Sequence, residues 1–188
     1  MKRKRAKKQL LTAVILGGML CMLLPAGAWA AGPRLRVHYI NENGLMRTAE
    51  AEVLSSSHTT VLDGEWYVVD TDLEVEESIT VSGQVNLILM DDKTLTVTGS
   101  AMDAAVTVEH GNILTIYGQS HGTGKLVATG GLCGAGIGGG IGDNGGTINI
   151  SGGIVDATGG NSAAGIGGGN NGDGGTINIS GGTVDATS

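Results

Sequence analysis

The second half of the chain consists of two consecutive segments that are nearly identical. Residues 130–158 read GGLCGAGIGGGIGDNGGTINISGGIVDAT and residues 159–187 read GGNSAAGIGGGNNGDGGTINISGGTVDAT, with 21 of 29 aligned positions the same. A fixed period of this size is typical of solenoids, in which each repeat forms one coil stacked on the preceding coil. The phased apolar residues between the glycines argue against a flexible glycine-rich linker.

Each repeat contains two short stretches in which polar and apolar residues alternate. Residues 147–150 (TINI) and 155–158 (VDAT) have this pattern, and glycines at 152–153 and 159–160 separate them from their neighbours. Alternation indicates a strand with one buried face, and glycine supplies the positive φ that tight corners need. A third, glycine-dominated side follows from residue 164. The sequence therefore predicts an all-β fold, a right-handed parallel β-helix whose strands lie ~4.8 Å apart.

Superposing the two repeats predicts which side chains stack from coil to coil. The apolar positions would form ladders inside the solenoid, because one coil cannot bury its own apolar face. These ladders are Ile137/Ile166, Ile148/Ile177, Ile150/Ile179, Val155/Val184 and Ala157/Ala186. The alternating polar positions would point outward as the ladders Thr147/Thr176, Asn149/Asn178 and Asp156/Asp185.

The region before the repeats is poor in glycine but rich in strand-like segments. Residues 31–117 hold 6 glycines, whereas residues 118–188 hold 26. We expect residues 31–63 to form a strand-rich N-terminal cap and residues 64–188 to form the β-helix, as one domain. Because the repeats run to the end of the sequence, we expect an open parallel edge on the final coil, which permits end-to-end association unless the chain is a fragment or another surface covers that end.

Residues 1–30 have the three parts of a signal peptide. Six Lys and Arg residues between positions 2 and 8 precede an apolar run at 10–24, and Ala28-Trp29-Ala30 supplies a cleavage site. We expect cleavage after Ala30. The mature protein would then have no membrane span and would be secreted or extracellular, with association with the cell wall as a further option. A retained transmembrane anchor is disfavoured because the run is short. A lipoprotein signal at Cys21 is disfavoured by the bulky Leu20 before it.

The charge of the expected mature protein is strongly negative. Residues 31–188 hold 5 Lys and Arg against 18 Asp and Glu, a net charge of −13. This balance argues against nucleic acid and anionic membrane surfaces as partners. Cys133 is the one cysteine outside the leader, so no internal disulfide and no cysteine zinc site are expected.

Several motifs together resemble a known group of proteins. The segments WYVV, NILTIYGQS and the GAGIGGG and GGTINISGG repeats, covering roughly residues 36–188, resemble glycine-rich-repeat surface proteins of anaerobic Gram-positive bacteria. The resemblance implies a pectin-lyase-like parallel β-helix that is secreted. It further implies an adhesive or glycan-binding role, which is supposed rather than shown for such proteins. The present chain departs from the pattern in having two GIGGG units and no LPxTG-like wall-anchoring motif.

Catalytic residues are not indicated by the sequence. A lyase acting on uronic acids needs a base and neutralising cations, and the arginines (Arg34, Arg36, Arg47) all lie in the expected cap. Asp91 and Asp92 are adjacent and more typical of a turn. The Asp156/Asp185 ladder, with rungs about 5 Å apart, could raise one pKa or hold a cation, but a solvated surface is the simpler interpretation. We therefore expect no enzyme, with a polysaccharide lyase or hydrolase as the alternative.

No cofactor is predicted. Residues 168–175 are similar to the calcium-binding nonapeptide of β-rolls, yet the 29-residue period does not fit, and Asp143 aligns with Gly172 rather than with Asp173. Calcium is the one candidate ion, and a polar loop tip is the simpler interpretation of these residues. The glycine-rich GAGIGGG lacks the following helix that a phosphate-binding loop requires.

The candidate ligand contacts are aromatic residues that could stack on sugar rings. Trp66, Tyr67 and Tyr117 are the candidates, and the adjacency of Trp66 and Tyr67 on one strand predicts that one of them faces inward. The sequence thus favours a non-catalytic structural or adhesive module whose partner is a glycan or a host surface.

Overall fold

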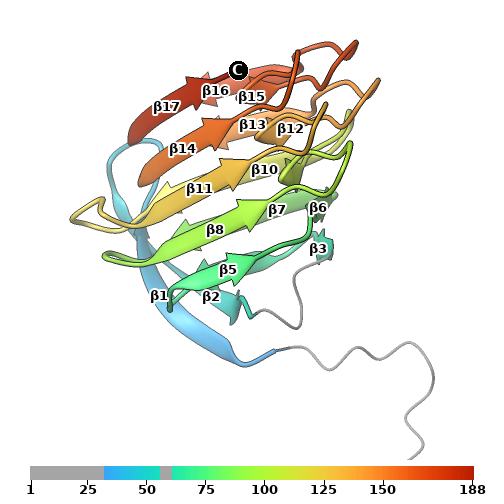
Figure 1. Ribbon diagram of the computed structural model, residues 1–188. Helices are drawn as coiled ribbons and strands as arrows, with labels where there is room; N and C mark the ends of the chain where they lie inside the picture. The colour runs from blue at the N-terminus through green and yellow to red at the C-terminus, as the bar shows by residue number, and fades with distance from the viewer. Residues whose placement is uncertain (1–31, 56–60) are drawn as a thin grey trace, which may run out of the picture. The chain divides into compact units, whose positions relative to one another are not determined.

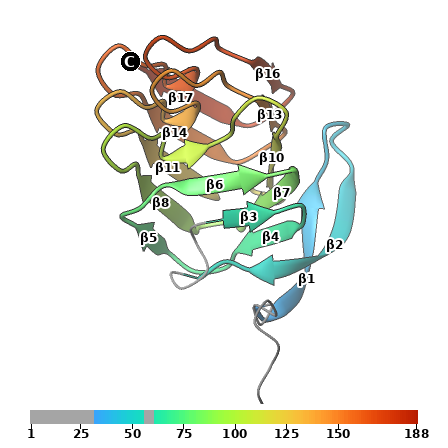
Figure 2. The same ribbon diagram turned by 90° about the vertical axis from the view of Figure 1, so that its right-hand side faces the viewer.

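The computed structural model describes residues 32–55 and 61–188 as an all-β structure. The chain runs along one side at the front of Figure 1, passes behind on the right, returns along the back and climbs to the next coil, which is a right-handed winding (Figures 1 and 2). The predicted parallel β-helix is therefore confirmed. The predicted signal peptide, residues 1–30, lies outside the described residues, as do residues 31 and 56–60 of the predicted cap. No described helix is long and apolar enough to span a membrane.

The described strands form three sheets, and each coil contributes one strand to each sheet in turn. Sheet 1 contains β1 (Arg34–Ile40), β2 (Met46–Val53), β4 (Trp66–Val69), β7 (Gln84–Leu89), β10 (Ile113–Gly118), β13 (Thr147–Ile150) and β16 (Thr176–Ile179). Sheet 2 contains β5 (Leu73–Val75), β8 (Thr94–Thr98), β11 (Lys125–Thr129), β14 (Ile154–Thr158) and β17 (Thr183–Thr187). Sheet 3 contains β3 (Val61–Asp63), β6 (Ile79–Ser82), β9 (Val106–Thr107), β12 (Ile137–Gly138) and β15 (Ile166–Gly167).

The last two coils are in register with the repeat in the sequence. Strand pairing sets Ile137 opposite Ile166, Ile148 opposite Ile177, and Val155 opposite Val184. The predicted pairing of the ladders is confirmed. Identical side chains lie opposite one another because, in all three sheets, paired residues of these two coils are separated by one repeat length.

Earlier coils have other lengths. Trp66 lies opposite Asn86, a shorter offset than that of the repeat, whereas Ile113 lies opposite Thr147, a longer one. The turn from sheet 3 to sheet 1 accounts for much of this difference. It contains Gly83 alone between β6 and β7, but residues 139–146 between β12 and β13. The lengthening loops are visible on the right of Figure 1.

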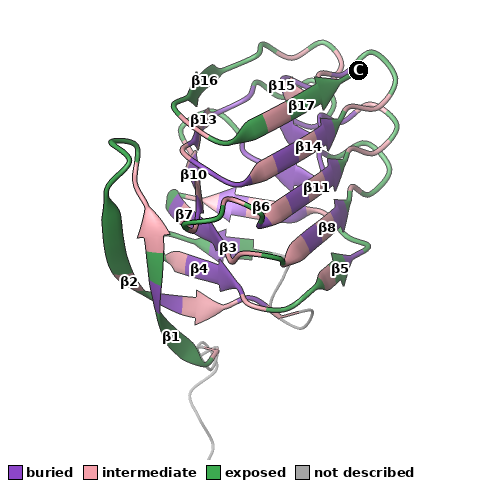
Figure 3. Ribbon diagram, turned by 90° about the vertical axis from the view of Figure 1, so that its left-hand side faces the viewer, coloured by how far each residue is buried: buried purple, intermediate pink, exposed green. Residues whose placement is uncertain are grey.

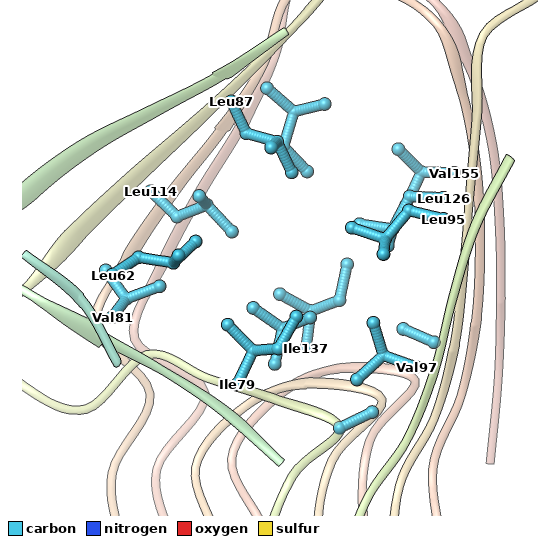
Figure 4. Close-up of a cluster of buried hydrophobic side chains, with 14 of the residues drawn as sticks. Leu62, Ile79, Val81, Leu87, Leu95, Val97, Leu114, Leu126, Ile137 and Val155 are labelled. Carbon is cyan, nitrogen blue, oxygen red and sulfur yellow. The ribbon is translucent and has the colours of Figure 1, made fainter. Parts of the chain in front are cut away.

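The core is a narrow stack of aliphatic side chains from the three sheets. Figure 4 shows Leu87 and Leu114 facing Leu95 and Leu126 across the interior, with Ile137 between them. All five residues are at most 2% exposed. Because Leu, Ile and Val have no polar atoms to satisfy, they close-pack without buried hydrogen-bonding groups.

The final coil departs from the sequence-based expectation. Ile177 and Ile179 pair with buried residues of β13, yet they are 40% and 56% exposed because no described strand stacks on their other side. In Figure 3, β16 and most of β17 are green, whereas the coils below are largely purple inside. The prediction that both isoleucines lie in the interior is therefore wrong for this coil.

An antiparallel hairpin, β1–β2, covers the outer face of the first coils. β2 pairs in parallel with β4, and Val37 and Ala51 pack on Val68 and Ile88 in a second small core. Strands β4 and β7 are therefore buried on both faces where the hairpin covers them, which explains the continuous apolar runs at 66–69 (WYVV) and 87–89 (LIL). The hairpin stands beside sheet 1 in Figure 2.

Side chains in the turns join one coil to the next. Asp91, in the turn after β7, accepts hydrogen bonds from the backbone N–H groups of His121 (3.1 Å) and Thr123 (3.2 Å) and contacts His121 Nδ1 at 3.0 Å. Burial alone would raise the pKa of Asp91, but these hydrogen bonds outweigh burial and lower it from its ordinary value. The carboxylate therefore stabilises the fold while it is ionised.

Replacing Asp91 with asparagine should lower the free energy of unfolding at pH 7 by about 1–3 kcal/mol, because a hydrogen-bonded charge is lost. The pKa of Asp91 is lower in the folded chain, so its contribution is complete above the unfolded value of about 3.9 and disappears as the pH falls through the folded value. Urea unfolding at pH 7 and at low pH checks this result. Asp92→Asn, at the exposed neighbouring position, is the control, and an Asp91 effect that is unchanged at low pH would contradict the assignment.

Candidate functional site

Beyond the hairpin, the outer face of sheet 1 changes from apolar to polar. One row across the strands begins with the covered Val68 and Ile88 and reaches Tyr117 on β10. Ser151 and Ser180, directly after β13 and β16, continue this row. A second, parallel row comprises Trp66, Asn86, Thr115, Asn149 and Asn178.

The polar ends of both rows line a groove of about 290 Å³ beside the hairpin loop. Hydroxyl and amide side chains predominate in this groove, and the hairpin contributes one carboxylate. The lining residues are Glu42, Thr115, Tyr117, Asn149, Ser151, Asn178 and Ser180. We refer to this site as the polar groove.

Hydrogen bonds between coils orient the amides of the polar groove. Asn178 Nδ2 donates to Asn149 Oδ1 (2.9 Å), and Asn149 Nδ2 donates to Thr115 Oγ1 (3.2 Å). Ser180 Oγ and Ser151 Oγ lie 3.3 Å apart in the neighbouring row. An amide has two N–H donors and two acceptor lone pairs, so each asparagine keeps capacity for a ligand after these bonds. The ladder therefore presents pre-oriented donors and acceptors.

Three aromatic rings meet beside the polar groove. The ring centroids of Trp66 and Tyr117 are 5.4 Å apart with planes only 16° from parallel, and Tyr39 of β1 lies 4.9 Å from Trp66 and 4.7 Å from Tyr117. All three side chains are partly exposed. Trp66 and Tyr117 were predicted from the sequence, whereas Tyr39 was not. Tyr39 follows Val37 by two residues and therefore lies on the same face of β1, and this spacing could have identified it from the sequence.

Tyr67 does not belong to this site. The side chain faces the solenoid interior and is 8% exposed, and its hydroxyl accepts a hydrogen bond from the backbone N–H of Asp63 (3.2 Å). The prediction of Tyr67 as a glycan contact is therefore wrong. The prediction that one of the two adjacent aromatics faces inward is confirmed.

The hairpin loop sets the position of Glu42. Asn41 Oδ1 accepts hydrogen bonds from the backbone N–H groups of Asn43 (3.1 Å) and Leu45 (2.9 Å), which holds the loop in a defined turn. Burial raises the pKa of Tyr39 and of Tyr117, and the negative charge of Glu42 raises both further. Both phenols are therefore protonated at neutral pH and can donate hydrogen bonds.

The remaining predicted surface ladders lie outside the polar groove. Asp156 and Asp185 pair across β14 and β17, and Lys125 Nζ approaches Asp156 Oδ2 at 3.4 Å. Thr147 and Thr176 pair at the start of β13 and β16 and do not line the groove. Within residues 32–55 and 61–188, no group of three or more His, Cys, Asp or Glu residues is placed to hold a metal ion.

A smaller hollow of about 190 Å³ lies between the hairpin and the turns after β7 and β10. Gln119 spans it: its Nε2 donates to the His38 carbonyl (2.9 Å), and its Oε1 accepts from the backbone N–H of Asp91 (3.0 Å). These bonds connect the hairpin to two coils. They hold β1, and therefore Tyr39, against the solenoid.

Parallel strands stacked in three sheets define a parallel β-helix protein, and this one has a polar groove on one outer face. A family model described as a beta helix repeat matches residues 148–170 and 177–188, within the two repeats. This match supports a parallel β-helix family. No curated protein and no solved structure matches the chain.

Proposed function

We propose that this protein is a secreted or surface-displayed β-helix that binds glycans in the polar groove, without catalysis, and so serves an adhesive role. The observation that carries the proposal is the groove itself, where rows of amides and hydroxyls lie beside three aromatic rings. Sugar hydroxyls both donate and accept hydrogen bonds, and sugar rings have apolar faces that pack on aromatic side chains. Tyrosine and tryptophan side chains combine an apolar ring with a polar group, which suits such a ligand.

The carboxylate content of the groove favours binding over hydrolysis. Glycosidases of the usual kind use two carboxylates on either side of the scissile bond. Among the described residues that line the polar groove, Glu42 is the one carboxylate. The resemblance to glycine-rich-repeat surface proteins of anaerobic Gram-positive bacteria supports the same role, and a polysaccharide lyase or hydrolase is the alternative that the experiment must address.

The test is a glycan array probed with the chain and with the double variant Asn149→Ala/Asn178→Ala, with and without calcium. We expect a loss of affinity of about 5- to 150-fold in the double variant, because each of the two lost hydrogen bonds contributes about 0.5–1.5 kcal/mol. Thr158→Ala, on the outer face of sheet 2, is the matched control and should change the affinity by less than about twofold.

Three outcomes would contradict the proposal. Glycan binding that is unchanged in the double variant would exclude the polar groove as the site. Cleaved product in the binding reactions would favour the enzyme alternative. Failure to bind any glycan would favour a purely structural spacer.

Export can be tested separately. When the full chain is expressed in a Gram-positive host, the protein recovered outside the cells should begin at Ala31, because Ala28 and Ala30 form the cleavage site. Mass spectrometry of the N-terminal peptide provides the measurement. A membrane-bound product that retains residues 1–30 would instead indicate an uncleaved anchor.

A further inference from the structure

The binding groups of the polar groove repeat along the solenoid axis rather than along any one strand. β10 contributes Thr115 and Tyr117, and the next coil contributes Asn149 with Ser151. The final coil repeats the second pair with identical residues, Asn178 and Ser180. Thr115 is 7% exposed and its hydroxyl accepts the Asn149 hydrogen bond, so Tyr117 is the more accessible of the two β10 residues. Since neighbouring strands are ~4.8 Å apart, the polar groups of the three coils extend over ~10 Å.

The hairpin closes one end of this array. Val68 and Ile88 occupy the same row as Tyr117, but Val37 and Ala51 cover them. The groove therefore begins at Tyr117, which is in contact with Trp66 and Tyr39, and at Glu42. It continues toward β16 as amides and hydroxyls alone. The groove has an aromatic end and a polar end.

The charge around the groove disfavours acidic ligands. Of the described residues that line it, none is Lys or Arg, and Glu42 places a carboxylate at the aromatic end. Arg34 is engaged elsewhere by Glu65 at 2.9 Å, and Lys125 faces Asp156 on sheet 2. Arg47 lies opposite Tyr39 in the hairpin but does not line the groove. An acidic sugar over the lining residues would therefore meet the like charge of Glu42 without a lining cation to neutralise it.

We propose that the polar groove selects an uncharged, extended glycan that lies along the solenoid axis, one ring on the Tyr39–Trp66–Tyr117 cluster and the following rings over the Asn–Ser pairs. This inference rests on the proposed glycan-binding function and adds the ligand class, its direction and its length. With one ring over each of the strands β10, β13 and β16, the array would hold about three sugar rings.

The experiment is calorimetric titration of the chain with cello-, manno- and xylo-oligosaccharides, from mono- to hexasaccharide, and with oligogalacturonates of the same lengths. We expect the affinity for at least one neutral series to rise with length and to level off at about three rings. Oligogalacturonates should bind at least tenfold more weakly. Glu42→Gln should narrow that difference, because it removes the like charge without removing the hydrogen-bonding side chain.

A variant at the polar end tests the direction of binding. Asn178→Ala should weaken trisaccharide binding several-fold while leaving binding of the monosaccharide unchanged, since the first ring sits on the aromatic cluster. Thr158→Ala should change neither. An equal loss for both lengths would show that the ligand does not run along the axis.

The outcomes separate this inference from the function on which it rests. Oligogalacturonates that bind as tightly as neutral oligosaccharides, and that still depend on Asn149, would overturn the ligand class but leave glycan binding in the groove. Binding by none of the neutral or acidic series would overturn the proposed function as well.

Discussion

Ile148→Asp is expected to abolish cooperative folding of the coils around β13. Ile148 is 0% exposed and lies between Leu114 on β10 and Ile177 on β16. An aspartate there would place a charge in an aliphatic interior without a partner, which costs several kcal/mol or more. Even Ile148→Ala should lower the free energy of unfolding by about 2–5 kcal/mol through the cavity it leaves. Thermal and urea unfolding followed by circular dichroism provide the measurement.

Ile177→Asp is the matched control for this prediction. It alters the neighbouring rung of the same ladder, but at 40% exposure the carboxylate can reach water. We expect a loss of less than about 2 kcal/mol, as for a surface change that also removes some apolar contact. If Ile177→Asp unfolded the chain as completely as Ile148→Asp, another surface would have to cover β16.

Gly160→Ala should destabilise the chain by about 3 kcal/mol, which is at the upper end of the usual cost of overpacking. A Cβ atom at this position would overlap the carbonyl oxygen of Gly131 in the coil below. The obstacle is backbone, which cannot rotate away as a flexible side chain could. The φ of Gly160 lies outside the left-handed region, so the expected cost is steric. Urea unfolding of the variant and the parent chain measures the difference.

Gly174→Ala serves as the control for the steric argument. Its Cβ would meet nothing within 4 Å, its φ is also unexceptional, and the position is exposed. We expect a change within about 0.5 kcal/mol in the midpoint-derived free energy of unfolding. An effect of Gly160→Ala as small as that expected for Gly174→Ala would mean that the glycine-lined corner tolerates a side chain and that the coils are farther apart there than in the structure.

The repeat was sufficient to predict the fold and two of the residues that line the polar groove, Asn149 and Asn178. Identical residues one repeat apart must stack if each repeat is one coil, and alternation then places Asn149 and Asn178 on the outer face. The earlier coils could not be predicted in the same way, because their lengths vary with loops that carry no repeat signal. The exposure of Ile177 and Ile179 depends on what stacks above them, which a pattern within the coil does not encode.

The aromatic end of the site depends on tertiary contacts. Glu42 and Tyr39 reach the site because β2 pairs with β4 and the hairpin packs on sheet 1, contacts that join segments with no common sequence pattern. The choice between Trp66 and Tyr67 was open for a related reason. Both faces of β4 are covered, so its sequence does not alternate between polar and apolar residues, and the pattern does not show which face points inward.

The shared offset of all three sheets in the last two coils has a consequence for how such a chain can change. Because β12–β15, β13–β16 and β14–β17 have the same spacing, a copy of the unit can be gained or lost by recombination within the coding sequence without disturbing the pairing of its neighbours. Each gain would add one asparagine and one serine to the polar groove. The length of the proposed glycan site would then depend on the number of repeat copies, and it would change by one coil at a time rather than by substitution.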